Sequence, residues 1–181
     1  SYVTFEPLGV VFAIMPWDFP CWQVVRCAAP ALVAGNVIIL KHSSYVPRCG
    51  LGLERIFKEA GMPDYTFNAI LAGSTVAERI IRSDIDAVSF TGSVGTGMRI
   101  AELAGKNLKK FVLELGGSDP FIVLDDADIN LSSQRAVESR MINNGQSCIA
   151  AKRFIVDSSI VEKFTETFVK KIRALRIGDP L

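Results

Sequence analysis

The sequence is poor in residues that bind metal ions or build disulfide frameworks. Its four cysteines, at positions 21, 27, 49 and 148, form no CxxC pair, and it holds a single histidine, His42. A structural zinc site needs four closely placed soft ligands, and a disulfide framework needs cysteines spaced along a short chain. We therefore expect neither a metal site nor a disulfide framework.

No charge of either sign is in excess, since 20 basic residues face 19 acidic ones and the formal net charge is +1. Such a balance creates no long-range field that would gather nucleic acid or an acidic membrane surface. The sequence also lacks an apolar run long enough to cross a bilayer, and its N-terminus lacks the order of a signal peptide. We expect a soluble, cytoplasmic protein with no nucleic-acid or membrane partner.

The chain does have the composition of a protein with a large buried core, because 49% of its 181 residues are hydrophobic and 22% are charged. Short apolar runs without strict polar alternation recur along it, as in strands buried on both faces, and helix-length segments lie between them. The pattern predicts an α/β fold with an open, mostly parallel sheet and helices on both faces. The expected strands are Gly9–Ile14, Val37–Leu40, Ala87–Phe90, Phe111–Leu115 and Phe121–Leu124, and the expected helices are Cys21–Val33, Arg48–Ala60 and Gly95–Ala104.

A polar, glycine-containing break at residues 143–148 follows a helix that is expected to begin near Asp128. Beyond the break, Ala151–Val156 is expected to be a strand, and Ser159 with Glu162 forms a capping-box pattern before an amphipathic helix. The apolar stripe of that helix needs a partner surface, yet little chain follows it. We therefore expect the chain to be a piece of a longer protein.

Cys148 ends the polar segment NNGQSC. A cysteine taken alone is usually an inert residue of the core. In a polar loop, however, backbone amides favour the thiolate, and the sulfur stays within reach of a substrate. Cys148 is therefore a candidate nucleophile.

Glu114 places a carboxylate inside the run FVLEL, which is expected to be a buried strand. A buried charge costs free energy unless it is paired or used. Glu114 is either a satisfied core glutamate or a general base whose affinity for a proton is raised by burial. Gly116 and Gly117, which follow, allow another chain segment or a ligand to come close.

Three further motifs follow strands of the expected sheet: PWDFP at 16–20, KHSS at 41–44 and FTGSVGTG at 90–97. The glycine turn of the third leads into the N-terminus of a helix, where a phosphate binds well. It is not the GxGxxG dinucleotide fingerprint, and a tight turn without a ligand looks similar. All three lie at the carboxyl ends of strands, the edge where open α/β sheets bind ligands.

The chain resembles the aldehyde dehydrogenase family over essentially its whole length. The resemblance lies in the order and spacing of five motifs: PWDFP, KHSS, FTGSVGTG, LELGG and GQSC. The specific part is LELGG followed about thirty residues later by GQSC. The resemblance implies a Rossmann-like NAD(P)-binding domain at 1–145, then the cysteine loop and the start of a catalytic domain at 146–181. Family members are much longer, so we expect this piece alone to be inactive.

The resemblance further implies that the protein oxidises an aldehyde to a carboxylic acid. Cys148 attacks the aldehyde, the thiohemiacetal gives a hydride to the nicotinamide, and Glu114 activates the water that hydrolyses the thioester. The segment LELGGSDPFIVLDDAD is similar to succinate-semialdehyde dehydrogenases, which suggests succinate semialdehyde as the substrate. The whole enzyme is expected to be a homo-oligomer.

The same resemblance implies a set of cofactor contacts. The adenine ribose is contacted by the KHSS residues Lys41, His42, Ser43 and Ser44, and the pyrophosphate by Gly92 and Ser93. The rest of the cofactor is contacted by Trp17, Asp18 and Leu115. Gly97 permits close packing of a helix. NAD-preferring members commonly carry Glu where Ser44 stands, and a carboxylate would repel a 2′-phosphate. We therefore expect NADP rather than NAD, with Lys41 and His42 favouring the phosphate further.

Asp18 departs from the family pattern, which places Asn there to donate a hydrogen bond to the oxyanion formed when Cys148 attacks. An ionised Asp only accepts hydrogen bonds. Three interpretations compete: a weakened natural enzyme or engineered variant, an Asp kept protonated by apolar surroundings, and a local geometry that aims the side chain elsewhere. We favour the first.

Two other functions stay open at this point. One is an acyl-phosphate or acyl-thioester reductase of the same superfamily, which needs no hydrolytic base, so Glu114 argues against it. The other is a nucleotide-binding relative that has lost catalysis, an interpretation that Asp18 supports.

Overall fold

The computed structural model of the protein describes residues 1–179. The chain forms two compact units, which we call unit 1 (Ser1–Gly116) and unit 2 (from Gly117 onward). This division follows packing within the chain. The predicted boundary between residues 145 and 146 concerns the domains of the longer protein and stays a prediction.

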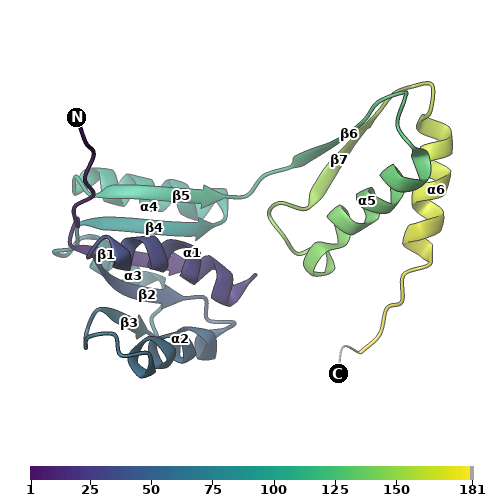
Figure 1. The fold of residues 1–181 in the computed structure, drawn as a ribbon. Helices are drawn as coiled ribbons and strands as arrows, with labels where there is room; N and C mark the ends of the chain where they lie inside the picture. The colour runs from purple at the N-terminus through teal and green to yellow at the C-terminus, as the bar shows by residue number, and fades with distance from the viewer. Residues whose placement is uncertain (180–181) are drawn as a thin grey trace. The chain divides into compact units, whose positions relative to one another are not determined.

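Unit 1 is built on a five-stranded sheet in which every neighbouring pair of strands is parallel (Figure 1). Its spatial order is β3-β2-β1-β4-β5. The strands are β1 (Val10–Met15), β2 (Val37–His42), β3 (Phe67–Ile70), β4 (Ala87–Gly92) and β5 (Lys110–Leu115). This confirms the predicted parallel α/β fold. The order is also that of the first five strands of a dinucleotide-binding sheet.

Four helices connect these strands: α1 (Pro20–Val33), α2 (Pro47–Glu59), α3 (Ser74–Ile81) and α4 (Val94–Lys106). The three predicted helices of unit 1 are confirmed to within a few residues at their ends. The strand β3 and the helix α3 were not predicted. They complete the alternation of strand and helix between α2 and β4.

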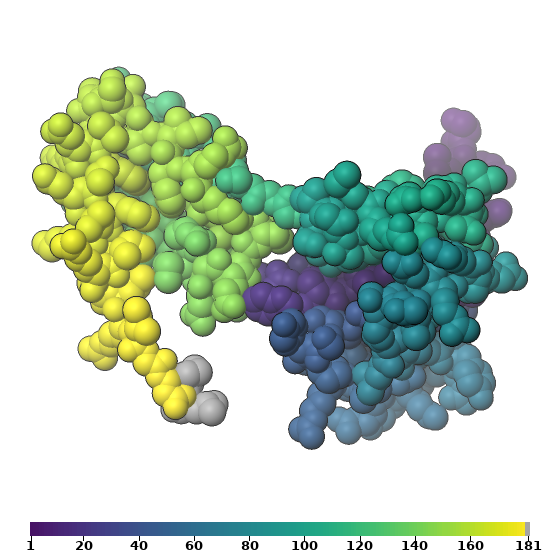
Figure 2. Space-filling view, turned by 180° about the vertical axis from the view of Figure 1, so that it is seen from behind, coloured from purple at the N-terminus to yellow at the C-terminus, as the bar shows by residue number. Residues whose placement is uncertain are grey.

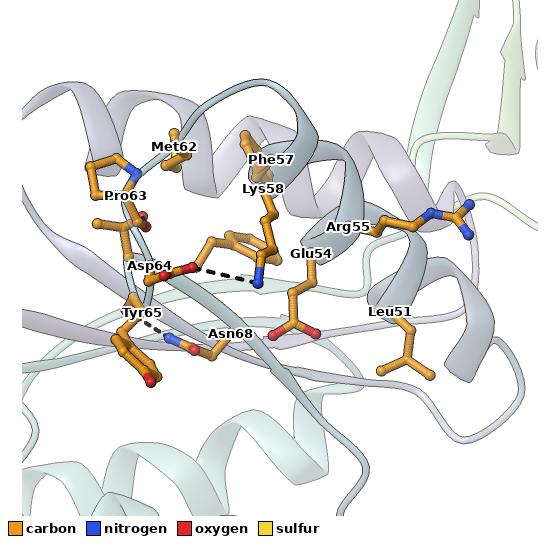
Figure 3. A pocket seen from close by; sticks show the side chains of 12 residues that line it. Leu51, Glu54, Arg55, Phe57, Lys58, Met62, Pro63, Asp64, Tyr65 and Asn68 are labelled. Atoms are coloured by element: carbon orange, nitrogen blue, oxygen red, sulfur yellow. Dashed lines mark hydrogen bonds and ion pairs between the residues drawn. The ribbon is translucent and has the colours of Figure 1, made fainter.

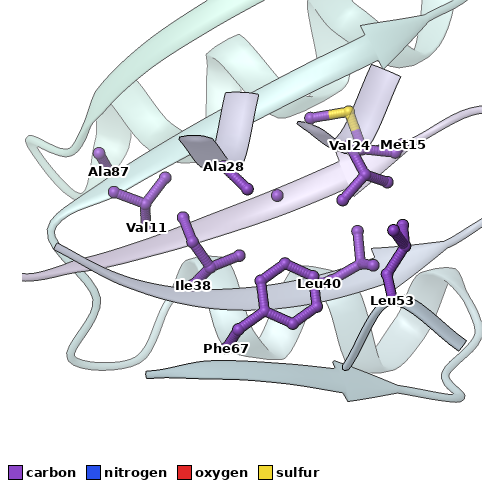
Figure 4. Packing of buried hydrophobic residues seen from close by; sticks show 10 residues of the cluster. Val11, Met15, Val24, Ala28, Ile38, Leu40, Leu53, Phe67 and Ala87 are labelled. Carbon is purple, nitrogen blue, oxygen red and sulfur yellow. The ribbon is translucent and has the colours of Figure 1, made fainter. Parts of the chain in front are cut away.

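Side chains of β1 alternate between two cores, one on each face of the sheet. Val11 and Met15 point to the core shared with α1 and α2, which Figure 4 shows. Phe12 and Ile14 point to the core shared with α3 and α4. Burial of a side chain such as Phe12, which is fully buried, stabilises the fold by roughly 1.5–3 kcal/mol. The helices therefore cover both faces, as predicted.

The N-terminal segment before β1 lies outside both cores. Tyr2, Val3 and Phe5 are between 85% and 90% exposed. In the space-filling view this segment, coloured purple, projects from unit 1 (Figure 2). These three side chains therefore add nothing to the packing that positions the candidate site.

Unit 2 holds two parallel strands, β6 (Asp119–Val123) and β7 (Ala151–Val156), with the helices α5 (Ile129–Met141) and α6 (Val161–Arg173). A one-turn 3-10 helix, η1 (Ile142–Gly145), follows α5.

The amphipathic helix α6 finds a partner surface inside unit 2. Phe164 is buried in the core of the unit, and the ring of Phe168 lies 4.9 Å from that of Phe154 on β7. The predicted capping box is wrong, because Ile160 is the N-cap and Ser159 instead donates two hydrogen bonds to Asp157. An Asx turn thus competes with the cap for the serine.

Neither a membrane-spanning helix nor a metal cluster occurs among residues 1–179. None of the helices is long and apolar enough to cross a bilayer. No three His, Cys, Asp or Glu side chains are grouped so that they would hold a metal ion.

Candidate functional site

The strand order makes the carboxyl ends of β1 and β4 the switch point of the sheet. From β1 the chain winds outward through β2 and β3, and then returns to form β4 and β5 on the other side. The connections therefore leave in opposite directions at these two strands, and ligands of open α/β sheets bind at such a switch point. The segments Pro16–Pro20 and Gly92–Ser93 follow directly there.

The loop after β1 carries two predicted site residues just before a residue with strained backbone. Trp17 is 42% exposed, and Asp18 is half-buried. Phe19 adopts left-handed φ and ψ values of 48° and 56° immediately before α1 begins at Pro20. Such a conformation costs a non-glycine residue about 1–3 kcal/mol and tends to occur where function requires it. Asp18 has neither a hydrogen bond nor an ion pair with any described residue.

The turn after β4 presents the N-terminus of α4. Ser93 is its N-cap, and its Oγ accepts a hydrogen bond from the Thr96 amide at 3.4 Å. The remaining amides of an exposed first turn suit an anion such as a pyrophosphate. Deeper in the helix, a Cβ at Gly97 would overlap the Leu115 side chain. The close helix packing predicted at Gly97 is therefore present in the structure.

A hollow of about 340 Å³ lies on the α3 and α4 side of the sheet, next to this turn. Its size falls in the range of small-molecule sites. Apolar side chains such as Ile14 and Ile100 form part of its wall, and Lys41, near the end of β2, also lines it. Polar and flexible residues of the two helices complete it: Ser74, Glu78, Gly95, Thr96 and Arg99. Apolar walls with a few convergent polar groups fit the adenosine half of a dinucleotide.

Arg99 and Glu78 tie the two helices beside this hollow. The Nε and Nη2 atoms of Arg99 each lie 3.2 Å from a Glu78 carboxylate oxygen, which is a bidentate pair. The Arg99 guanidinium holds the pKa of Glu78 below its ordinary value. Sequence reasoning missed both residues, because a glutamate and an arginine 21 positions apart give no local signal.

The KHSS segment divides between the two faces of the sheet. Lys41 faces the hollow, whereas His42 is buried on the α1 and α2 side. The His42 Nε2 lies 2.9 Å from the Pro20 carbonyl oxygen, and its Nδ1 accepts the Ser43 amide at 2.9 Å. Both ring nitrogens are thus occupied. This geometry contradicts a direct contact between His42 and a cofactor phosphate, because neighbouring strand residues point to opposite faces.

Glu114 is not buried in unit 1. Its side chain is 54% exposed, because β5 is an edge strand with one neighbour, so the expectation of a buried strand is wrong here. The Arg26 Nη1, on α1, lies 3.8 Å from the Glu114 Oε1. The carboxylate is therefore paired and open on one side. Arg26 was not predicted, and only the packing of α1 against this sheet face reveals it.

Cys148 lies in unit 2, half-buried in the turn between η1 and β7. Asn143 and Asn144 adopt left-handed conformations before it, with φ values of 49° and 58°. The Lys152 Nζ donates hydrogen bonds to three carbonyl oxygens of the turn. Ser147 is 6% exposed, and its Oγ finds no partner among the described residues.

The structure thus gathers the predicted cofactor segments at one edge of a single sheet. The loop with Trp17 and Asp18, the turn with Gly92 and Ser93, and Lys41 all stand at carboxyl ends of neighbouring strands. Glu114 belongs to this unit as well, whereas Cys148 belongs to the other. The pairing of Cys148 with Glu114 stays a prediction.

A second hollow, of about 420 Å³, lies between α2 and the loop that leads to β3 (Figure 3). The Lys58 Nζ lies 3.6 Å from Asp64 across it, and Asn68 donates to the Tyr65 carbonyl oxygen at 2.7 Å. None of the predicted site residues lines it. The hollow beside Lys41 is therefore the better candidate for a ligand site, because a predicted site residue lines it, although its volume is smaller.

Comparison with known proteins matches residues 1–181 to the model of the aldehyde dehydrogenase family. The chain is 53% identical over 181 residues to a probable succinate-semialdehyde dehydrogenase [NADP(+)] of Synechocystis, covering 99% of this chain and 40% of that protein. It is 51% identical to a succinate-semialdehyde dehydrogenase [NADP(+)] of Mycobacterium avium, covering 99% and 38%. The chain thus spans about two fifths of the length of these curated relatives.

Solved structures give the same result. A lactaldehyde dehydrogenase superposes with a TM-score of 0.93 at 38% identity, covering 97% of this chain and 37% of that one. A betaine aldehyde dehydrogenase of Staphylococcus aureus, in complex with NAD+, superposes with a TM-score of 0.92 at 35% identity, covering 96% and 35%.

Proposed function

This chain belongs to the aldehyde dehydrogenase family, and from that membership we propose that the whole protein oxidises an aldehyde to a carboxylic acid with NADP. The observation that supports this most directly is the edge of the sheet in unit 1. There, a strained loop, a capped helix N-terminus and a hollow that Lys41 lines follow neighbouring parallel strands. Such an edge binds dinucleotides.

In the proposed reaction, the Cys148 thiolate attacks the carbonyl carbon of the aldehyde and forms a thiohemiacetal. A bound nicotinamide cofactor supplies the acceptor for the hydride. The resulting thioester is hydrolysed by a water molecule from which Glu114 takes a proton. The open side of the Glu114 carboxylate leaves room for that water, and Arg26 supplies a cation beside it.

For the cofactor we propose NADP, with Lys41, Ser44, Gly92, Ser93, Gly97, Trp17 and Leu115 as the binding residues. Ser44 is exposed at the end of β2, so it presents no carboxylate to a 2′-phosphate. The relatives named as NADP(+) enzymes support the same choice. His42 keeps a structural role in this proposal, as the link between β2 and the start of α1.

For the substrate we propose succinate semialdehyde, which the names of the relatives support. This aldehyde carries a carboxylate that needs a cation in the site. Arg26 is a candidate for that cation, since its side chain is 42% exposed and lies beside Glu114. We expect Arg26→Leu to raise KM for succinate semialdehyde while leaving KM for butanal unchanged.

The test of the proposed function is an assay of the whole protein with NADP or NAD and a panel of aldehydes, in which reduced cofactor is followed by absorbance. Succinate semialdehyde with NADP is expected to give the highest kcat/KM. Turnover only in the reverse direction, with acyl phosphates or thioesters, would identify a reductase instead. Cofactor binding without turnover of any of these substrates would identify a relative that has lost catalysis.

Two properties of the whole protein stay proposals of the same kind. We propose that it is a homo-oligomer, which sedimentation of the whole protein tests. We also propose that it is cytoplasmic, which fractionation of cells that express it tests.

A further inference from the structure

Lys152 makes an unusual set of contacts around the cysteine turn. It is the second residue of β7, and its Nζ returns to the turn that precedes the strand. The Nζ donates to the carbonyl oxygens of Cys148 at 2.7 Å, Ala150 at 3.2 Å and Ser147 at 3.3 Å. A lysine ammonium has three N–H donors, so all of them form hydrogen bonds with the backbone of one turn.

These contacts fix the direction of the peptide groups beside Cys148. In a planar trans peptide the N–H points opposite to the C=O. Because the Ser147 carbonyl points to the ammonium, the Cys148 N–H points away from it. Within the described part of the chain, no acceptor takes that N–H. The turn therefore presents a free backbone donor on the residue that is the proposed nucleophile.

The backbone preferences of the segment before Cys148 would not by themselves keep the Cys148 N–H in this direction. Asn143, Asn144 and Gly145 all have positive φ values, which are 49°, 58° and 76°. The Arg140 Nη1 holds the Gly145 carbonyl oxygen at 3.2 Å on the upstream side. Lys152 holds the downstream side through its three carbonyl contacts, so cationic side chains hold the backbone at both ends of the turn that contains Cys148.

We propose that Lys152 is a positioning residue for the attack by Cys148, because its ammonium keeps the Cys148 N–H aimed at the oxygen that becomes negative in that step. The inference rests on the proposed function. A donor of this kind acts on the transition state and therefore on kcat.

The test compares Lys152→Met, Lys152→Gln and Lys152→Arg in the whole enzyme. The control is Lys163→Met, an exposed lysine of the same unit, on α6, whose ammonium forms no ion pair or hydrogen bond with the described residues. We expect Lys152→Met and Lys152→Gln to lower kcat by roughly 10–100-fold while KM and the Kd of NADP change by less than about twofold. Lys152→Arg, which restores a cationic donor, is expected to recover part of kcat, and the control is expected to match the unmodified enzyme.

A second readout needs neither aldehyde nor cofactor. Loss of the contacts that hold the turn is expected to change the rate at which iodoacetamide alkylates Cys148 by about threefold at neutral pH. An enzyme that oxidises no aldehyde would refute the proposed function, whereas an active enzyme whose Lys152→Met variant keeps its kcat would refute the inference about Lys152 alone. The inference is overturned if Lys152→Met keeps its kcat within twofold of the control, or if both uncharged variants fail to fold.

Discussion

The packing of Gly97 against Leu115 leads to a prediction about two glycines of α4. Substitution by alanine is expected to lower stability at one of them and to raise it at the other. An added Cβ at Gly97 would overlap one methyl group of Leu115 and lie 3.1 Å from the other. Carbon atoms pack at about 3.5–4.0 Å, so Leu115 would have to move by roughly 1 Å. Overpacking of this kind costs about 1–3 kcal/mol, and alanine returns about 1 kcal/mol of helix propensity. We expect Gly97→Ala to destabilise unit 1 by about 0–2 kcal/mol.

Gly105, in the last turn of α4, is the matched control. A Cβ there would meet nothing within 4 Å, and its φ is not positive. Gly105→Ala is therefore expected to stabilise α4 by about 0.5–1 kcal/mol. Amide hydrogen exchange of the α4 and β5 peptides in the whole enzyme measures both changes in stability. Titration with NADP measures the effect of each substitution on cofactor affinity. Equal protection of these amides in the two variants would refute the packing argument.

Three further predictions address the chemistry of the whole enzyme. Asp18→Asn is expected to raise aldehyde turnover by at least roughly tenfold, with little change in cofactor affinity, because the family resemblance implies that Asn at this position donates to the oxyanion. Steady-state kinetics check this, and an unchanged or lower kcat would contradict it. Ser44→Glu is expected to narrow or reverse the preference for NADP, measured as the ratio of the two dissociation constants, and an unchanged ratio would show that Ser44 does not face the ribose. Cys148 is expected to be the first thiol alkylated by iodoacetamide near neutral pH. Burial raises the pKa of Cys27, and burial with the neighbouring Cys21 thiol raises that of Cys49. Their thiolate fractions thus stay low at neutral pH and grow only at higher pH than usual, and peptide mapping across a pH series tests the order.

The sequence identifies most elements of the sheet because their signals are local. The apolar runs of β1, β2 and β4 and the helix-length segments between them have the lengths and the turn residues of such elements. β3 escapes this reasoning because it is only four residues long and contains Asn68. Its strand conformation depends on pairing with β2, a long-range contact that local propensity does not encode.

The exposure of Glu114 shows what a strand pattern alone does not predict. The run FVLEL has the composition of a central strand, yet the order β3-β2-β1-β4-β5 places it at the edge of the sheet. The sequence gives the order of strands along the chain and not their order in space. A charged residue in an apolar run therefore indicates a central strand only when the topology is already known.

The parts of the candidate site that follow directly after strands were predictable from the sequence. The part that depends on backbone geometry, the turn around Cys148, was not. PWDFP, KHSS and FTGSVGTG reveal themselves by position, because the carboxyl ends of parallel strands share one edge. Within KHSS, the period of two along a strand already separates Lys41 from His42, so the prediction for His42 conflicted with a rule that the sequence supplies. No such rule exists for Lys152. A lysine near the start of a strand has the appearance of an ordinary solvated charge, and only the three-dimensional turn brings three carbonyl oxygens to its ammonium. The residues that hold a reactive loop in place are thus less visible in a sequence than the residues that react, because holding is done by backbone atoms, which every residue shares.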